Sequence, residues 1–394
     1  MSKKNILKDS LINILATALP LLVLQLISLP NAASKLDADT FGIVITLISI
    51  LTVISFPAGN VLNNIRLLRN DIYSKEGLQG DFNYLLVGAS FISSVMMVIF
   101  SFIFIESLNY INLLLLVLIV IFSIFKEYLI VSYRISLNFK GILLNNVLLS
   151  LGYMIGTLIF HITGFWEFIY LVGLLISLIY VVTTTDLLAE PLRKTKMYNT
   201  TLKEFLILYG SSLLSNFLGY ADKIILLPLL GPKNVAIYYA ASIIGKIASM
   251  LITPINSVIL SYIVKIEKIN HKVFIKALSL VSIIGVIGYF VTVIISPYFL
   301  KIFYPLWADQ SVNLIYITSA TAIIAVLSSV FHPFNLRYNK LKWQVYMSGT
   351  NLIFYLLLAY FLTYSHGLFG FTLAVLISSI YNFLFQLIIY FRIK

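Results

Sequence analysis

Long apolar stretches recur along the whole chain, each about as long as a membrane helix. A helix that crosses a bilayer needs about 20 mainly apolar residues, and twelve stretches meet this length. The runs are unbroken rather than alternating, so they predict α-helices and not the strands of a β-barrel. The predicted spans are residues 11–30, 41–62, 83–105, 112–133, 142–161, 166–185, 204–229, 234–260, 276–296, 311–331, 344–364 and 368–390.

The composition agrees with this pattern. Hydrophobic residues make up 60% of the 394 residues and charged residues only 11%, against about 25% in a soluble domain. A globular protein of this size needs a larger polar surface. The composition therefore excludes a soluble enzyme, a nucleic-acid binder and a disordered chain, and predicts an all-α integral membrane protein.

The charges predict how the chain is oriented. With an even number of spans both termini share one side, and 22 of the 27 lysines and arginines fall on that side. Three fall on the opposite side, and the two others, Lys223 and Lys246, lie inside spans. Because cytoplasmic loops are enriched in basic residues, we expect both termini in the cytoplasm.

A weak internal repeat divides the chain. Leu-Pro pairs at 29–30 and 227–228 each end a span, and a second proline follows 27 and 26 residues later. Prolines are common in membrane helices, so chance is the alternative explanation. The repeat predicts two parallel six-helix halves, residues 1–190 and 191–394, with a ligand site at their interface.

Three charged residues lie deep in predicted spans: Asp222, Lys223 and Lys246. Each costs roughly 2.5–3.5 kcal/mol at the centre of a bilayer. Polar residues continue along one face of the seventh span and one face of the eighth; the faces comprise Ser212, Asn216, Gly219, Tyr220 and Lys223, and Ser242, Lys246, Ser249, Thr253 and Asn256. These faces predict a cationic, water-filled cavity; the alternatives are a buried ion pair such as Asp222 with Lys246, and a Lys223 that reaches the headgroups.

A second polar patch ends the second span. Asn60, Asn64 and Arg66 fall on one side of this helix. Amides and a guanidinium suit a sugar or phosphate ligand, and an ordinary headgroup-contacting loop is the alternative. At the inner end of the fourth span, interfacial anchors are expected at Lys126, Glu127 and Arg134.

No catalytic constellation is found in the sequence. There is no GxxxxGKS loop and no HExxH motif, and cysteine is absent. The external loops are too short for a catalytic domain. We therefore expect neither an enzyme nor a bound cofactor or metal.

Several short motifs resemble those of a known family. The opening ILATALPLLVLQLISLP (14–30) is followed by FPAGNVLNNIRLLRN (56–70) and GDFN (80–83). ADKIILLPLLGP (221–232) and IYYAA (237–241) follow in the second half. Together they resemble Wzx-type polysaccharide flippases of the multidrug/oligosaccharidyl-lipid/polysaccharide (MOP) exporter superfamily.

The resemblance implies a MATE-like fold and a flippase of the bacterial cytoplasmic (inner) membrane. Its substrate would be an undecaprenyl-diphosphate-linked oligosaccharide, a repeat unit of O-antigen or capsule. Membrane lipids would surround it, and an association with the polysaccharide polymerase machinery stays open. The resemblance places Asp222 and Lys223 at the family's charged position; the polar faces and patch add Lys246, Asn216, Tyr220, Asn256, Asn60, Asn64 and Arg66 as candidate substrate-binding residues. The alternatives are a cation-coupled antiporter of the same superfamily and a membrane polysaccharide polymerase or ligase.

Overall fold

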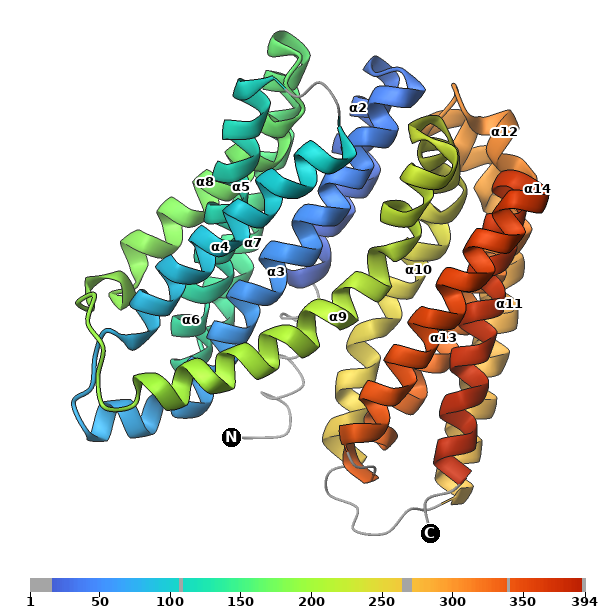
Figure 1. Ribbon diagram of the computed structural model, residues 1–394. Coiled ribbons are helices and arrows are strands. Elements are labelled where there is room, and N and C mark those ends of the chain that lie inside the picture. The colour runs from blue at the N-terminus through green and yellow to red at the C-terminus, as the bar shows by residue number, and fades with distance from the viewer. Residues whose placement is uncertain (1–15, 106–108, 264–270, 339–340, 392–394) are drawn as a thin grey trace. The chain divides into compact units, whose positions relative to one another are not determined.

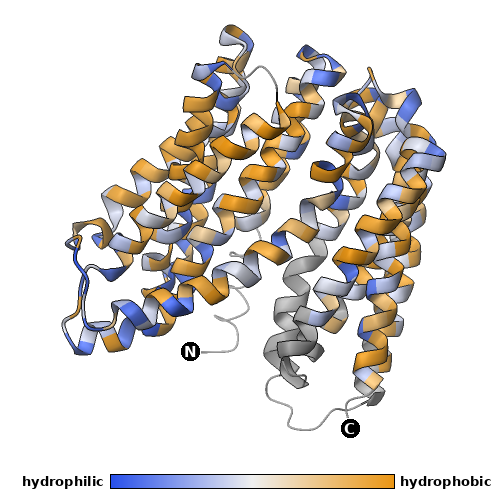
Figure 2. Ribbon diagram, in the orientation of Figure 1, coloured by the Kyte–Doolittle hydropathy of each residue, from blue (hydrophilic) through white to orange (hydrophobic). Residues whose placement is uncertain are grey.

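The structure, a computed structural model, describes residues 16–105, 109–263, 271–338 and 341–391, with side chains except those of 250–274, 276, 277, 280, 330 and 332–345. Every regular element within these ranges is a helix (Figure 1). Nine of the described helices are long and apolar enough to cross a membrane. Figure 2 shows the apolar residues running along these helices, whereas the segment between α8 and α9 is hydrophilic.

The contacts divide the chain into two compact units. Unit 1 is Met1–Ala32 with Thr46–Ile224, and unit 2 is Ala33–Ile45 with Ile225–Lys394. The chain passes between the units inside α2, α3 and α9, so the units differ from the sequence halves. The two halves that the sequence repeat predicts, residues 1–190 and 191–394, stay a prediction.

The helices in unit 1 begin with one that contains a π-helical turn. The remaining helices of unit 1 follow in chain order, and α2, α3 and α9 also extend into unit 2. The elements are η1 (Leu24–Ser28), α2 (Leu29–Lys35), α3 (Ala38–Lys75), α4 (Asp81–Phe104), α5 (Tyr110–Leu129), α6 (Val131–Ile135), α7 (Phe139–Thr163), α8 (Glu167–Thr184), η2 (Leu187–Ala189) and α9 (Tyr198–Leu230).

Unit 2 contains the remaining helices. They are α10 (Pro232–Ile263), α11 (His271–Phe303), α12 (Ala308–Val312), α13 (Ile315–Tyr338) and α14 (Leu341–Phe391). α14 contains a break at Gly367, whose φ of 57° lies in the left-handed region. This break falls between the predicted spans 344–364 and 368–390. Each predicted span thus lies mostly in helix where the chain is described, although 112–133 and 311–331 each contain a turn, after α5 and after α12. The count of twelve membrane crossings stays a prediction.

Small residues let helices approach closely within unit 1. A Cβ at Gly152 of α7 would lie 2.5 Å from the Cα of Gly173 in α8, and a Cβ at Gly156 would lie 2.2 Å from the Phe168 carbonyl oxygen. This is the close approach of two helices that a small-xxx-small pair allows. Gly59 likewise lets α3 approach α5 closely, because a Cβ at Gly59 would lie 2.6 Å from the Cβ of Glu127.

Aromatic rings fill one end of unit 2. Phe41 stacks on Trp307 at a centroid distance of 4.8 Å and meets Tyr239 edge-on at 5.8 Å. All three rings are buried. They join the start of α3 to α10 and to the segment before α12, as expected when large aromatic groups are removed from solvent together.

Candidate functional site

Residues 80–83, called the GDFN turn, connect α3 to α4 and begin α4. Gly80 has φ 115°, in the left-handed region that favours glycine. A Cβ on Gly80 would lie 2.4 Å from the carbonyl oxygen of Pro191. Only glycine therefore lets this turn lie against the linker, defined as residues 185–197 between α8 and α9.

Polar side chains of the GDFN turn hold the linker. Asp81 accepts hydrogen bonds from the backbone N–H of Thr195 at 2.6 Å and from the hydroxyl of Tyr73 at 2.8 Å. Asn83 donates to the carbonyl oxygens of Leu187 and Glu190, both at 2.9 Å. Because Asp81 and Asn83 are buried, these bonds satisfy groups that would otherwise be desolvated without a partner.

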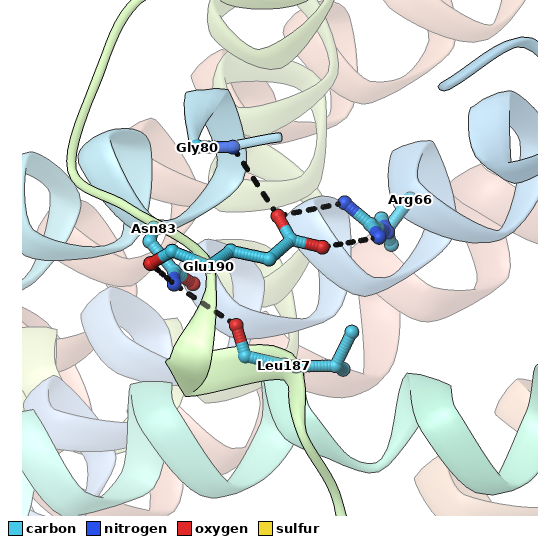
Figure 3. Close-up of polar contacts among 5 residues, drawn as sticks. All are labelled: Arg66, Gly80, Asn83, Leu187 and Glu190. Carbon is cyan, nitrogen blue, oxygen red and sulfur yellow. Dashed lines mark hydrogen bonds and ion pairs between the residues drawn. The ribbon is translucent and has the colours of Figure 1, made fainter. Parts of the chain in front are cut away.

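An ion pair lies at the centre of this arrangement (Figure 3). The Arg66 guanidinium of α3 meets the Glu190 carboxylate of the linker through two N···O contacts, 2.6 Å and 3.2 Å. The side chains are only 9% and 10% exposed. Glu190 also accepts from the N–H of Gly80 at 3.3 Å, and the guanidinium lies 4.9 Å from the centroid of the Phe82 ring. The pair is thus bidentate, buried and further hydrogen-bonded, the geometry in which a buried pair is strongest.

The predicted ligand patch on α3 is therefore divided in two. Arg66 binds Glu190, whereas Asn60 and Asn64 lie on a partly exposed surface. The Asn64 amide donates to Asn60 Oδ1 at 2.8 Å, and Asn64 Oδ1 accepts from Arg134 at 2.9 Å. Asn60 and Asn64 thus stay candidates for ligand contact, and Arg66 is committed to the linker in this structure.

The prediction of interfacial anchors at the inner end of the fourth span is wrong for Lys126. This residue is buried, and its ammonium pairs with the neighbouring Glu127 at 2.8 Å. Arg134 turns towards the asparagines of α3. The sequence shows only that Lys126 and Glu127 lie near the end of a predicted span. It does not show that α3 approaches α5 closely at Gly59 and buries Lys126.

Asp222 and Lys223 form an ion pair with each other within α9. The side chains are 17% and 4% exposed, so Lys223 does not reach outward to the headgroups as an exposed residue would. Adjacent residues point about 100° apart on a helix, and the long lysine side chain folds back to the carboxylate. The two charges of this position largely neutralise each other.

The two predicted polar faces are found on α9 and α10. Asn216 and Tyr220 are partly exposed on α9, and the Asn216 amide donates to the Ser212 carbonyl at 2.9 Å. On α10, Lys246 is partly exposed. Another side of α10, away from this polar face, packs on α13. There Gly245 of α10 approaches Ala322 of α13, and the Ala241 carbonyl accepts a hydrogen bond from the Thr318 hydroxyl. The side chain of Asn256 lies outside the described residues.

Sequence reasoning missed the residues that fix the linker. Glu190 does not stand out in the sequence, because its partner is 124 residues away. A signal was nevertheless present in the GDFN motif. Its glycine, aspartate and asparagine are residue types that turns and caps require, and the structure shows that each contacts the linker.

Comparison with solved structures places this architecture among known transporters. The chain is similar to an inward-facing multidrug resistance MATE family transporter of the MOP superfamily, with a TM-score of 0.68 and 14% identity over 97% of this chain and 95% of that one. It is similar to the lipid II flippase MurJ in an inward closed conformation, with a TM-score of 0.64 and 16% identity over 89% and 86%. The bent form of the Vibrio cholerae MATE transporter VcmN matches with a TM-score of 0.57 and 13% identity over 99% and 96%.

The chain has the fold of MOP-superfamily transporters and flippases. With its nine apolar helices of membrane-crossing length in the described residues, it is a multi-pass membrane protein. No protein-family model and no curated protein matches the sequence. The expected superfamily fold is thus confirmed, whereas the Wzx-type specificity stays a prediction.

Proposed function

We propose that this protein is a flippase that moves an undecaprenyl-diphosphate-linked oligosaccharide, an O-antigen or capsule repeat unit, across the bacterial cytoplasmic membrane. The observation that carries the proposal is Lys246, a partly exposed lysine on the polar face of α10. α10 contains the predicted span 234–260, and a lysine within such a span points to a water-filled or ligand-binding surface. A diphosphate–oligosaccharide headgroup is anionic and rich in hydroxyls, so it needs positive charge and hydrogen-bonding groups together.

Further polar residues supply the hydrogen-bonding groups that the sugar hydroxyls need. Asn216 and Tyr220 on α9 offer amide and hydroxyl groups, with Asn256 as a further candidate on α10. Asp222 and Lys223 neutralise each other, so Lys246 is the lysine of the two polar faces that we propose contacts the diphosphate. Moving a headgroup breaks no covalent bond, so we expect neither catalytic residues nor a cofactor. Alternating access would carry the headgroup across, and both termini would lie in the cytoplasm.

A cation-coupled antiporter is the second candidate function. MATE transporters are among the structurally similar proteins. Glu167, the first residue of α8, is fully buried, and no basic side chain among the described residues forms an ion pair with it. An uncompensated buried carboxyl is the kind of group that a coupling cation or proton occupies. A polymerase or ligase is less well supported, because the external connections are short.

Translocation of lipid-linked oligosaccharide in membrane vesicles tests the proposal. Wild type should move the lipid-linked glycan, and Lys246→Ala should lose most of this activity at matched expression. Lys301→Ala is the control, because it removes an exposed lysine at the end of α11. If wild type moves no lipid-linked glycan but expels a cationic dye when a proton or sodium gradient is imposed, the antiporter is correct and the flippase proposal is wrong.

A further inference from the structure

Arg134 occupies an unusual position at the end of α6. Its guanidinium Nη1 donates to the side-chain oxygens of both Asn63 and Asn64 on α3. The residue is partly exposed rather than fully on the surface. An arginine that only anchors a helix to headgroups would extend into solvent, whereas this one lies against amide groups of another helix.

The charges around Arg134 do not balance. Arg66 pairs with Glu190, and Lys126 pairs with Glu127. No carboxylate in the described part of the chain lies within 4.0 Å of the Arg134 guanidinium. Amide oxygens solvate a cation but carry no net charge, so one positive charge at this end of α3 and α5 has no counter-charge.

Hydrogen-bond donors also stay available beside this charge. Among the described residues, Nε and Nη2 of Arg134 donate to no protein acceptor. Asn60 uses its Oδ1 to accept from Asn64, and its amide N–H groups have no acceptor among the same residues. Arg134 and Asn60 are both partly exposed, so a ligand approaching from outside the helices reaches them.

A ligand that completes this site must be an anion with several acceptor oxygens. The planar fork of an arginine binds two phosphate oxygens at once, and an adjacent amide donates to a third. The geometry of α3 is rigid here, because Gly59 brings its backbone against α5 and Asn63 donates to the Glu127 carbonyl at 2.8 Å. The donors are thus positioned before any ligand arrives, which lowers the entropic cost of binding.

We infer that Arg134 and Asn60, oriented by Asn64, bind a diphosphate group where α6 meets α3. The identity of the carrier rests on the proposed function: it would be the diphosphate of the lipid-linked oligosaccharide. The anion site itself follows from the unbalanced charge and the unused donors.

Binding of inorganic pyrophosphate to the full chain in phosphatidylcholine nanodiscs tests the site. Wild type should bind, and Arg134→Gln should weaken binding by about tenfold or more, as expected for charge-assisted hydrogen bonds. Arg134→Lys should fall between them, since it keeps the charge but loses the fork. Lys75→Gln is the matched control: it removes an exposed cation at the end of α3, the helix that carries Asn60, and should bind within about twofold of wild type.

Asn60→Ala tests the same site without changing Arg134, in case the Arg134 variants do not fold. It removes the free amide donors and keeps the arginine, and it should weaken binding by a few-fold. The inference is wrong if wild type does not bind pyrophosphate, or if folded Arg134→Gln and Asn60→Ala proteins both bind like Lys75→Gln.

Competition identifies the source of the anion. A polyprenyl diphosphate in the nanodisc should displace pyrophosphate from wild type, whereas phosphatidylglycerol at the same mole fraction should not. Displacement by phosphatidylglycerol would overturn the assignment to a diphosphate. If pyrophosphate binding depends on Arg134 while the vesicle assay shows no glycan translocation, the flippase proposal fails and the anion site stands.

Discussion

Arg66 and Glu190 are 124 residues apart in the sequence and form a bidentate ion pair that is almost closed to solvent. The pair joins the C-terminal part of α3 to the linker that leads to α9. Because the same carboxylate also accepts from the Gly80 N–H, one acidic side chain holds three parts of unit 1 together. Removing one partner therefore leaves a charge buried with no counter-charge.

Glu190→Gln should strongly destabilise unit 1. Breaking a buried pair by removing one partner costs about 3–5 kcal/mol, and the substitution leaves the Arg66 guanidinium uncompensated. Thermal unfolding of the detergent-solubilised protein measures the effect. Glu76→Gln is the control, because the Glu76–Lys196 pair is mostly exposed and such pairs contribute little. Equal melting temperatures for the two variants would show that the buried pair does not hold the linker.

Gly80→Ala should release the linker from the GDFN turn. Its Cβ would lie 2.4 Å from the Pro191 carbonyl oxygen and 2.7 Å from that of Arg193, both rigid backbone atoms. Limited trypsin digestion at Arg193 and Lys194 reports the change, since cleavage needs the linker to leave its site. Gly77→Ala is a close control: Gly77 has φ 62°, also left-handed, but nothing lies within 4 Å of its Cβ position. Slow cleavage of both variants would contradict the prediction.

Asp37 should stabilise the start of α3 in a pH-dependent manner. Its carboxylate accepts hydrogen bonds from the backbone N–H groups of Asp39 and Thr40 and from the Thr40 hydroxyl. The backbone and side-chain hydrogen bonds from Thr40 lower the pKa of Asp37 below its ordinary value. Its contribution is therefore complete above the ordinary aspartate pKa of about 4 and is lost as the pH falls through the lowered pKa.

Asp37→Ala should lower the stability at neutral pH by about 1 kcal/mol, the usual effect of losing an N-cap. The difference from wild type should shrink in acid. Asp37→Asn serves as the control, because asparagine caps a helix without titrating. Unfolding curves at several pH values measure both effects, and a constant difference at every pH would rule out a role for the ionised carboxylate.

Gly152→Val should disrupt the contact between α7 and α8. The added side chain meets the backbone of Gly173, whose Cα lies 2.5 Å from the Cβ position, and overpacking of this kind costs about 1–3 kcal/mol. A lower melting temperature is the expected result. Gly210→Val in α9, where nothing lies within 4 Å, controls for the helix propensity of valine. A similar loss in both variants would mean that propensity, and not packing, explains the effect.

Much of the architecture could be predicted because the bilayer limits the possible structures. A backbone in hydrocarbon must satisfy its own hydrogen bonds, so apolar runs of sufficient length become helices, and the break at Gly367 falls where two predicted spans meet. The close packing at Gly152 and Gly156 was also predictable, because only a small residue lets two helix backbones touch.

The sites were less predictable, since a charge's role depends on its partner. Arg66 and Arg134 look alike in the sequence: both are arginines just after the C-terminal end of an apolar run. The structure gives Arg66 a carboxylate and leaves Arg134 with amides only. Asp222 was expected to be able to pair with Lys246, but it pairs with its neighbour Lys223, because a long side chain on the same helix reaches it.

The sequence by itself determined that this is a helical membrane protein, approximately where its helices lie, and which polar residues lie inside them. These properties follow from local hydropathy and helical periodicity, which need no knowledge of distant residues. Only the tertiary structure decided that the GDFN turn binds the linker, that Glu190 neutralises Arg66, and that Arg134 keeps an unbalanced charge. Each of these depends on contacts between helices far apart in the sequence, and such contacts exist only once the helices have packed.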